Sequence, residues 1–207
     1  MYRHALPVAA AAAIAVAGTL VLGAESGATS PSRHQPEVSY ASGGTFSMVI
    51  SSDPGDIDPY QSTEGTARQI YAFGYDTLLA RSPKGKPVAD LARSWSASPQ
   101  QVRYTLKPGV TCDDGATLTA SDVAQDFDYI KNPKTISPWL SFVLPIGYSV
   151  SADDATRTVT IKTVKPFGLL LQAAGELPIV CPQGLTDANS IQHKFDGTGP
   201  FQITSYS

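Results

Sequence analysis

The sequence is poor in the residues on which most catalytic and metal sites depend. Its 207 residues include three histidines and two cysteines, and His193 is the only histidine beyond residue 43. A histidine-based catalytic triad or a multi-histidine metal centre therefore has almost no material. The motifs Gly-x-Ser-x-Gly, His-Glu-x-x-His and Gly-x-x-x-x-Gly-Lys are missing as well. We expect no metal site, no other cofactor and no enzymatic activity.

Positive charge is also scarce. Lys and Arg number 15 against 18 Asp and Glu, which gives a formal net charge of −3. A protein that binds nucleic acid electrostatically carries clustered Lys and Arg and a high pI, so no nucleic-acid partner is expected. The 17 Gly and 16 Pro favour a body rich in turns and loops over a helical bundle.

The one long apolar run lies at the N-terminus. Arg3 precedes apolar residues 5–24, and small residues follow as far as Ala28. This is the layout of a secretory signal peptide, so we predict that residues 1–28 are removed and that the protein is extracytoplasmic. An uncleaved signal anchor is the alternative, because the run approaches the ~20 residues that span a bilayer. Glu25 stands where a lipoprotein would carry its modified cysteine, so we expect no lipid anchor.

Residues 29–43 are rich in Ser, Pro, Gly and Ala without apolar periodicity, and we predict a flexible linker there. From residue 44 onward, short β-prone runs alternate with helical segments, which predicts a mixed α/β body. The expected strands are 45–51, 102–107 and a hairpin at 150–162, with extended pieces at 178–182 and 201–205. The expected helices begin at Thr63 or Thr66, at Thr119 with a capping box to Asp122, and at Phe167.

Two patterns in the body have ordinary structural interpretations. Asp53, Asp56 and Asp58 do not match the spacing of a calcium loop, and beside Pro and Gly they are typical of turns. Cys112 and Cys181 are the only cysteines, and in an exported protein the simplest expectation is one disulfide. A hydrolase with two catalytic carboxylates stays open as an alternative function, because paired Asp or Glu leave no sequence signature.

A series of short motifs is more specific in its order than any of them is alone. The series comprises Ile57-Asp-Pro59, Tyr75-Asp-Thr-Leu-Leu79, Pro87-Val-Ala-Asp-Leu-Ala-Arg-Ser-Trp95, Tyr104-Thr-Leu-Lys-Pro-Gly-Val110, Asp114-Gly-Ala-Thr-Leu-Thr-Ala-Ser-Asp-Val123, Ser137-Pro138 and Gly197-Thr-Gly-Pro-Phe201. In this order, from Thr45 to Ser207, the sequence resembles the extracytoplasmic solute-binding proteins, family 5, which serve ABC importers of oligopeptides, dipeptides and nickel.

The resemblance implies a class II periplasmic-binding-protein-like clamshell of which this chain carries one part. Residues 44–74 and 193–207 would form part of domain I, residues 75–192 would form domain II, and the opposing lobe would lie outside the sequence. The implied function is the secreted capture of a peptide-like solute for transport. The implied partners are the ligand and the permease subunits, through which alone the protein would meet the membrane.

The resemblance also implies the binding residues. In peptide-binding relatives the loop after Ile-Asp-Pro lines the cleft, which here means Thr63, Glu64 and Gly65. Glu64 would offer a carboxylate to a ligand amine; the alternative is that Thr63 caps a helix and Glu64 favours its dipole. Trp139 follows Ser137-Pro138, where relatives place an aromatic residue against the ligand; packing beneath a surface loop is the alternative.

Overall fold

The computed structural model describes residues 43–187 and 189–205. The predicted signal peptide, residues 1–28, and all of the predicted linker except residue 43 lie outside the described residues. The chain divides into two units at Phe46. Residues 43–46, the described part of the first unit, contain no helix or strand, and every element below belongs to the second unit.

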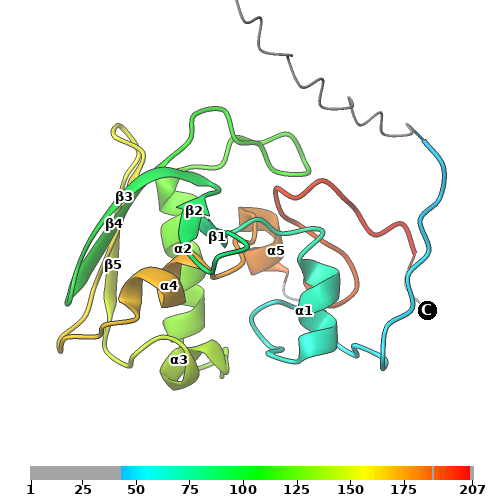
Figure 1. The fold of residues 1–207 in the computed structure, drawn as a ribbon, viewed down its shortest axis with the longest axis horizontal. Coiled ribbons are helices and arrows are strands. Elements are labelled where there is room, and N and C mark those ends of the chain that lie inside the picture. Colours follow the sequence, from blue (N-terminus) through cyan, green and yellow to red (C-terminus); the bar gives the residue numbers. More distant parts are fainter. Residues whose placement is uncertain (1–42, 188, 206–207) are drawn as a thin grey trace, which may run out of the picture. The chain divides into compact units, whose positions relative to one another are not determined.

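The second unit combines six strands with short helices (Figure 1). The strands are β1 (Leu79–Arg81), β2 (Pro87–Ala89), β3 (Ala92–Ser98), β4 (Gln101–Leu106), β5 (Ser149–Asp153) and β6 (Thr158–Lys162). The helices are α1 (Gly65–Tyr71), α2 (Ala120–Lys131), α3 (Trp139–Phe142), α4 (Leu170–Gly175), α5 (Pro182–Thr186) and the 3₁₀ turn η1 (Ser190–Gln192). This is the mixed α/β body that the sequence predicts.

The main sheet is antiparallel with the order β3-β4-β6-β5, and β1 and β2 form a separate hairpin. The alternation in 102–107 and 159–161 predicts strands with one buried face, and β4 and β6 form there. Tyr104 pairs with Val159 and Val102 with Ile161, and all four side chains are buried. Side chains opposite one another in register share a sheet face, so this pairing buries one apolar layer.

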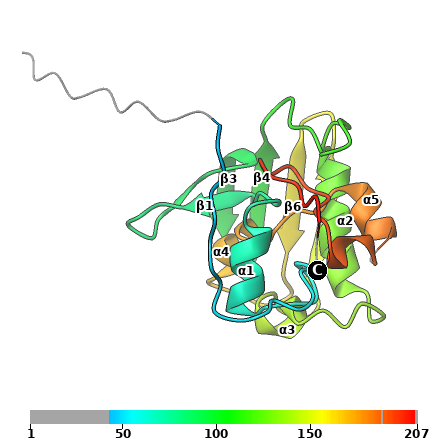
Figure 2. The ribbon, with the colours of Figure 1, turned by 90° about the vertical axis from the view of Figure 1, so that its right-hand side faces the viewer.

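Helix α2 begins where the capping box predicts. The Thr119 hydroxyl accepts the Asp122 N–H, and the Asp122 carboxylate accepts the Thr119 N–H at 2.8 Å. Val123, Phe127 and Ile130 are fully buried along one face of the helix, which packs against β5 and β6. Figure 2 shows α2 beside the sheet with α1 on the near side of the molecule.

The segments assigned to partial domain I by resemblance contribute to the same core as the rest. Ile57, Tyr60 and Phe195 are buried together with side chains of residues 75–192. Residues 199 and 201 lie alongside the end of α1, because their N–H groups donate to the carbonyls of Gly74 and Phe73 (Figures 1 and 2). The boundary between domains I and II stays a prediction.

Several of the expected elements differ in the structure. Residues 201–205, expected to be extended, form no strand. Residues 45–51 form no strand, because no other described segment pairs with them to complete a ladder. Helix α4 begins at Leu170, three residues after the expected start at Phe167. Residues 178–182 form only an isolated bridge between Pro178 and Thr77, and Pro182 then opens α5, a helix that the extended interpretation missed.

Candidate functional site

The loop before α1 is built on two aspartates that bind their own backbone. The Asp58 N–H donates to Asp56 Oδ1 and the Tyr60 N–H donates to Asp58 Oδ1, each at 2.7 Å. Asp58 is buried, and burial raises the pKa of its carboxyl from 3.8 to about 6 against the opposing effect of the Tyr60 N–H. These aspartates therefore form turns, as the sequence indicates, and no group of acidic or histidine residues among the described residues is arranged to hold a metal.

Tyr60 fixes this loop to the interior of the molecule. Its side chain is fully buried, and its hydroxyl lies 2.6 Å from Asp126 Oδ1 and 2.8 Å from the Pro178 carbonyl. Burial raises the pKa of Asp126 well above its ordinary value, against the opposing effect of the hydrogen bond from Tyr60. The Tyr60 hydroxyl donates towards both oxygens, and Asp126 Oδ1 also accepts the Val180 N–H at 3.3 Å.

A second set of bonds joins this loop to residues 135–139. Ser137 Oγ donates to the Tyr60 carbonyl at 2.6 Å, and Trp139 Nε1 donates to the Pro59 carbonyl at 2.7 Å. Gln61 Nε2 donates to the Thr135 carbonyl at 2.9 Å. The structure therefore brings the two predicted binding segments, 63–65 and the region of Trp139, into one neighbourhood although 70 or so residues separate them.

Three of the predicted binding residues lie at the surface where α1 begins. The N-cap is Glu64, without a side-chain capping bond, so the alternative in which Thr63 caps the helix is wrong. Thr63 is half-buried, Glu64 and Gly65 are exposed, and only the backbone of Glu64 is engaged, through Ser62 Oγ and the Arg68 N–H. Within the described segments the Glu64 carboxylate has no bonding partner and is open to a ligand.

Trp139 has different surroundings from these three residues. Only 4% of its surface is exposed, and its indole N–H is already bound to the Pro59 carbonyl. These surroundings favour the alternative in which Trp139 packs beneath a loop. Trp139 also lines a polar hollow of about 260 Å³.

Two hollows flank this neighbourhood. We call the first the apolar groove; its volume is about 560 Å³. It is lined by Thr63, Ile130, Asn132, Pro133, Ile136, Ser137, Pro138, Leu140, Ser141, Phe142 and Ile146. The second, of about 260 Å³, is polar and is lined by Arg68, Tyr71, Ala72, Tyr75, Asp76, Thr77, Asp90, Trp139, Glu176 and Pro178. Thr63 thus belongs to the first hollow and Trp139 to the second.

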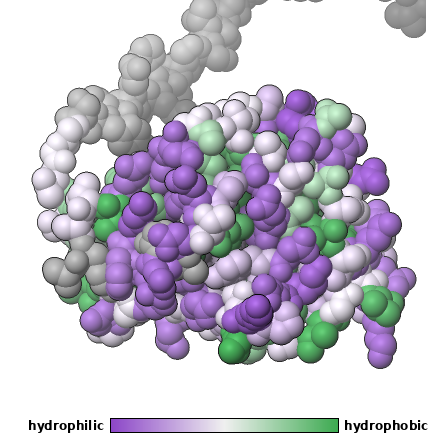
Figure 3. All heavy atoms as spheres, turned by 180° about the vertical axis from the view of Figure 1, so that it is seen from behind, coloured by the Kyte–Doolittle hydropathy of each residue, from purple (hydrophilic) through white to green (hydrophobic). Residues whose placement is uncertain are grey.

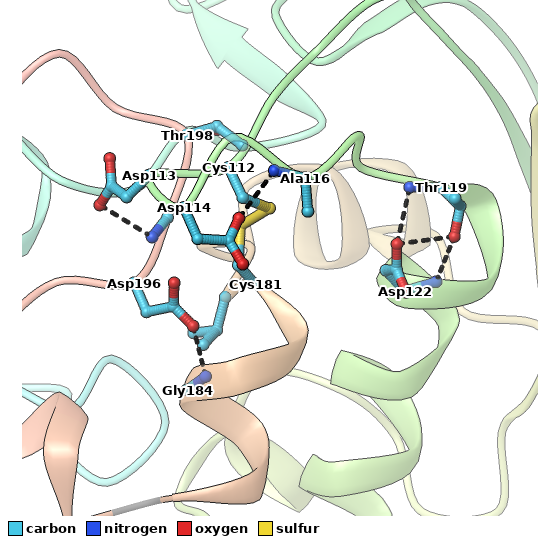
Figure 4. The surroundings of a disulfide bond; sticks show 12 residues. Cys112, Asp113, Asp114, Ala116, Thr119, Asp122, Cys181, Gly184, Asp196 and Thr198 are labelled. Atoms are coloured by element: carbon cyan, nitrogen blue, oxygen red, sulfur yellow. Dashed lines mark hydrogen bonds between the residues drawn. A yellow bond between two sulfur atoms is a disulfide. The ribbon is translucent and has the colours of Figure 1, made fainter.

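Cys112 and Cys181 form the expected disulfide (Figure 4). It is surrounded by backbone bonds made by carboxylates: Asp196 accepts the Gly184 N–H, and Asp113 Oδ2 accepts the Gly197 N–H at 3.4 Å. Burial raises the pKa of Asp196, which is 7% exposed. The disulfide and Asp196 therefore hold residues 195–197 against the start of α5.

Gly197 and Gly199 are required for a close backbone approach. A Cβ on Gly197 would lie 2.2 Å from the Gly74 carbonyl oxygen, and one on Gly199 would lie 2.5 Å from the Gly74 carbonyl carbon. Neither glycine has a positive φ. The absence of a side chain at these two positions therefore leaves space for two chain segments in direct contact.

Sequence reasoning missed Tyr60 and Asp126, which anchor the loop before α1, and Asp196, which anchors residues 195–197. Asp126 lies on the buried face of α2 beside Phe127, and that position was its one sequence signal. An acidic residue among apolar helix positions needs a partner inside the fold. Over residues 43–187 and 189–205, no helix combines the length and the apolar character needed to cross a membrane.

Comparison with known proteins identifies the fold. The sequence profile of the bacterial extracellular solute-binding proteins, family 5 (middle region), matches residues 86–207. The glutathione-binding protein GsiB of Pectobacterium atrosepticum is 26% identical over 165 residues, 77% of this chain and 32% of that protein. The chain therefore spans about a third of the length of the curated relatives it matches.

Solved structures show the same similarity. A substrate-binding protein of Microbacterium hydrocarbonoxydans, complexed with 4-hydroxybenzoate hydrazide, superposes with a TM-score of 0.66 at 28% identity over 74% of this chain and 33% of that one. The murein tripeptide binding protein MppA of Escherichia coli reaches a TM-score of 0.68 at 20% identity, with 76% and 35% of the two chains covered, and shows the fold alone. With the profile matching more than half of its residues, the chain belongs to family 5 of the bacterial extracellular solute-binding proteins.

Proposed function

We propose that this chain contributes one wall of the ligand site of a solute-binding protein that captures a peptide-like ligand for an ABC importer. The observation that carries the proposal is the segment 63–65. Glu64 and Gly65 are exposed, and the Glu64 carboxylate is unengaged by the described chain. Buried hydrogen bonds from Tyr60, Ser137 and Trp139 hold the loop before the segment in place. An unengaged polar group on an anchored backbone is suited to the recognition of a ligand.

The names of the relatives support a peptide-like ligand. GsiB is a glutathione-binding protein, and a Brucella abortus relative, 26% identical over 174 residues, is described as a putative ABC transporter peptide-binding protein. A peptide amine would donate to the Glu64 carboxylate, and such a charge-assisted bond contributes about 1.5–3 kcal/mol. Binding by Glu64, Thr63 and Gly65, with Trp139 behind them, is part of this proposal.

Location and partners follow from the same proposal. A protein of this family with the N-terminal layout described above would act outside the cytoplasm and deliver its ligand to permease subunits. The buried carboxylates give no support to the alternative of a hydrolase. Asp58, Asp126 and Asp196 are buried and each accepts hydrogen bonds from backbone or phenol groups of this chain, so their contacts are those of residues that stabilise the fold.

The test is an NMR titration of the ¹⁵N-labelled chain with the dipeptide Ala-Phe and its N-acetylated form. Because one wall supplies the contacts, we expect a Kd in the range of about 1 mM or weaker. Amide shifts should concentrate at residues 63–65. Glu64→Gln should weaken binding of the free-amine peptide about tenfold, by loss of about 1.4 kcal/mol, and leave the acetylated peptide unaffected.

Asp153→Asn is the matched control, because Asp153 is an exposed carboxylate at the end of β5 and lines a different hollow. It should leave the titration unchanged. Equal binding by the Glu64→Gln variant, or shifts that avoid residues 63–65, would refute the proposed role of this segment.

A further inference from the structure

The exposed apolar side chains of the described chain do not gather in one place. Val49, Ile136 and Val164 are 97%, 83% and 76% exposed and belong to three separate segments. Figure 3 shows a face of the molecule on which hydrophilic residues predominate and apolar ones are scattered. Scattered apolar side chains are normal on a protein surface and mark no partner. The unpaired backbone groups at the edges of the main sheet are the more specific feature.

The main sheet has two edge strands, β3 and β5, because its order is β3-β4-β6-β5. An edge strand presents backbone N–H and C=O groups that can pair with another strand. At β3, the chain before β1 bonds to the first residue, since the Ala92 N–H donates to the Leu78 carbonyl at 3.0 Å. From Arg93 to Ser98, no described segment other than β4 is hydrogen-bonded to the backbone of this strand. The outer edge of β3 is therefore open to a further strand over these residues.

Residues 94–98 of β3 lack the features that protect an edge strand from pairing. Protected edges carry charged side chains, a proline or a bulge. In β3 the register is irregular between Ala92 and Ser94, and Pro99 follows the strand, so both features lie outside this segment. Its sequence, Ser-Trp-Ser-Ala-Ser, carries no charge, whereas the shorter β5 ends in Asp153. Of the two edges, β3 is the one better suited to pair with another strand.

The segment is complementary to itself in antiparallel pairing. About a two-fold axis at Ser96, this residue faces its own copy and Ser94 faces Ser98. Trp95, which is half-buried, faces the small and exposed Ala97. Opposite residues share a sheet face, so serine meets serine on one face and a large side chain meets a small one on the other. Because the segment has no charge, the pairing brings no like charges together.

The same register continues both faces of the sheet from one copy to the next. Ser96 pairs with Arg103 of β4, which pairs with Thr160 of β6, and these three form a polar row. Trp95 belongs to the neighbouring row, in which its partner Tyr104 is fully buried. A shift by one residue would place the core-facing row of one copy on the polar face of the other. Alignment about Ser96 avoids this mismatch and uses the whole regular segment.

We infer that two copies of this chain associate through their β3 edges, antiparallel about Ser96, and join their four-stranded sheets into one. The contact uses the same surface of each copy, so the assembly closes at two copies. It does not depend on the ligand proposed above. Because residues 94–98 make most of the contact, the dimer should be weak and transient, with a Kd between about 10 µM and about 1 mM.

Sedimentation velocity of the full chain, from about 10 µM to about 1 mM, tests the inference. Ser96→Lys places two like charges opposite each other in the pair and should weaken association about tenfold or more. An equal mixture of Ser96→Lys with Ser96→Glu should regain association, because Lys then faces Glu. Ser151→Lys is the matched control: Ser151 pairs with Thr160 in the same polar row, on the β5 edge, and its variant should associate as the wild type does.

NMR spectra of the ¹⁵N-labelled wild type at the same concentrations provide a measurement that needs no variant. Amide shifts that change with concentration should concentrate at residues 93–98. A wild type that stays monomeric up to about 1 mM, or shifts that avoid these residues, would overturn the inference. So would association that Ser96→Lys leaves unchanged. Loss of association in Ser151→Lys alone would assign the contact to β5 and would overturn it as well.

Discussion

The sheet side of the molecule, strands β3 to β6, and the anchored side, residues 56–76 and 177–197, are stabilised in different ways. On the sheet side, side chains such as Val102, Val159 and Ile161 follow the period of the strands and are buried. On the anchored side, regular structure is short, and individual polar groups such as Tyr60 and Asp196 hold irregular chain in place. A repeating pattern tolerates a local change better than a structure that depends on single bonds.

The pKa values of the carboxyl groups are shifted in opposite directions on the two sides. Burial raises the pKa of Asp58, Asp76 and Asp196 on the anchored side. In the turn between β5 and β6, hydrogen bonds lower the pKa of Asp153, chiefly from the Thr156 side chain, and of Asp154, chiefly from the Ser121 side chain. The anchored side therefore gains stability from protonation, and the turn of the sheet side gains stability from ionisation.

The largest effect should come from the disulfide, which closes a loop of 69 residues. Replacing both Cys112 and Cys181 by Ala should lower the free energy of unfolding by about 4 kcal/mol, because the unfolded chain regains the entropy of that loop. Urea unfolding measures the loss, and the wild type under reductant should match the variant. A change below 1 kcal/mol in the urea experiment would contradict the prediction.

Hydrogen exchange on the same variant sharpens the comparison. Amide protection should fall first in α5 and residues 195–197, while the ladder of β4 and β6 keeps the highest protection. Uniform loss across both sides would show that they unfold as one unit and that the distinction drawn above has no energetic content.

Removing the hydroxyl oxygen of Tyr60, on the anchored side, should lower the free energy of unfolding more than changing the shape of a core side chain that packs beside the sheet. Tyr60→Phe leaves the Pro178 carbonyl and Asp126 without their buried partner, and we expect a loss of about 1–3 kcal/mol. Phe127→Leu changes the shape of a fully buried side chain on α2 and should cost less than about 1.5 kcal/mol. Urea unfolding of both variants compares them, and the reverse order would break the contrast.

The next effect depends on pH. Burial raises the pKa of Asp58 from 3.8 to about 6, so the folded protein takes up a proton that the unfolded chain at the same pH does not bind. The resulting stabilisation is complete below pH 3.8 and is lost as the pH rises through 6. Between pH 7 and pH 5 the contribution of Asp58 should increase stability by about 1 kcal/mol.

Asp58→Asn isolates this contribution, because an amide oxygen can still accept the Tyr60 N–H. The gain in stability on acidification should be smaller in this variant than in the wild type, with Asp153→Asn as the control that leaves the gain intact. A pH profile identical to that of the wild type would show that Asp58 does not titrate between pH 5 and 7.

The sequence predicted the sheet side well and the anchored side poorly, for a physical reason. Alternation in 102–107 and the helical spacing of Val123 and Phe127 are local patterns, and a local pattern determines which face is buried. The partners of Tyr60 lie 66 and 118 residues away, at Asp126 and Pro178, and no local period records such a distance.

The candidate site was likewise predictable only in part. The choice of Thr63–Gly65 followed from a resemblance carried by the motif Ile57-Asp-Pro59, and in the structure Glu64 and Gly65 are exposed and Thr63 is half-buried. The burial of Trp139 depends on the Pro59 carbonyl, 80 residues earlier, and could not be read from the Ser-Pro-Trp motif itself. Ile136 gives no sequence signal for its positive φ, because isoleucine normally disfavours that conformation.

The smallest effect tests a feature that the sequence predicted in full, the capping box of α2. Thr119→Ala removes the oxygen that accepts the Asp122 N–H and should destabilise the protein by about 1 kcal/mol in urea unfolding. Thr119→Ser keeps that oxygen and should recover most of the loss, which separates the cap from the packing of the Thr119 methyl group. Because α2 carries Asp126 as well as the sheet-facing Phe127, fraying at its first turn should lower amide protection on the sheet side before it reaches Tyr60. Simultaneous loss of protection on both sides in the Thr119→Ala protein would show that α2 couples them rigidly, and the two sides would then have to be treated as a single cooperative structure.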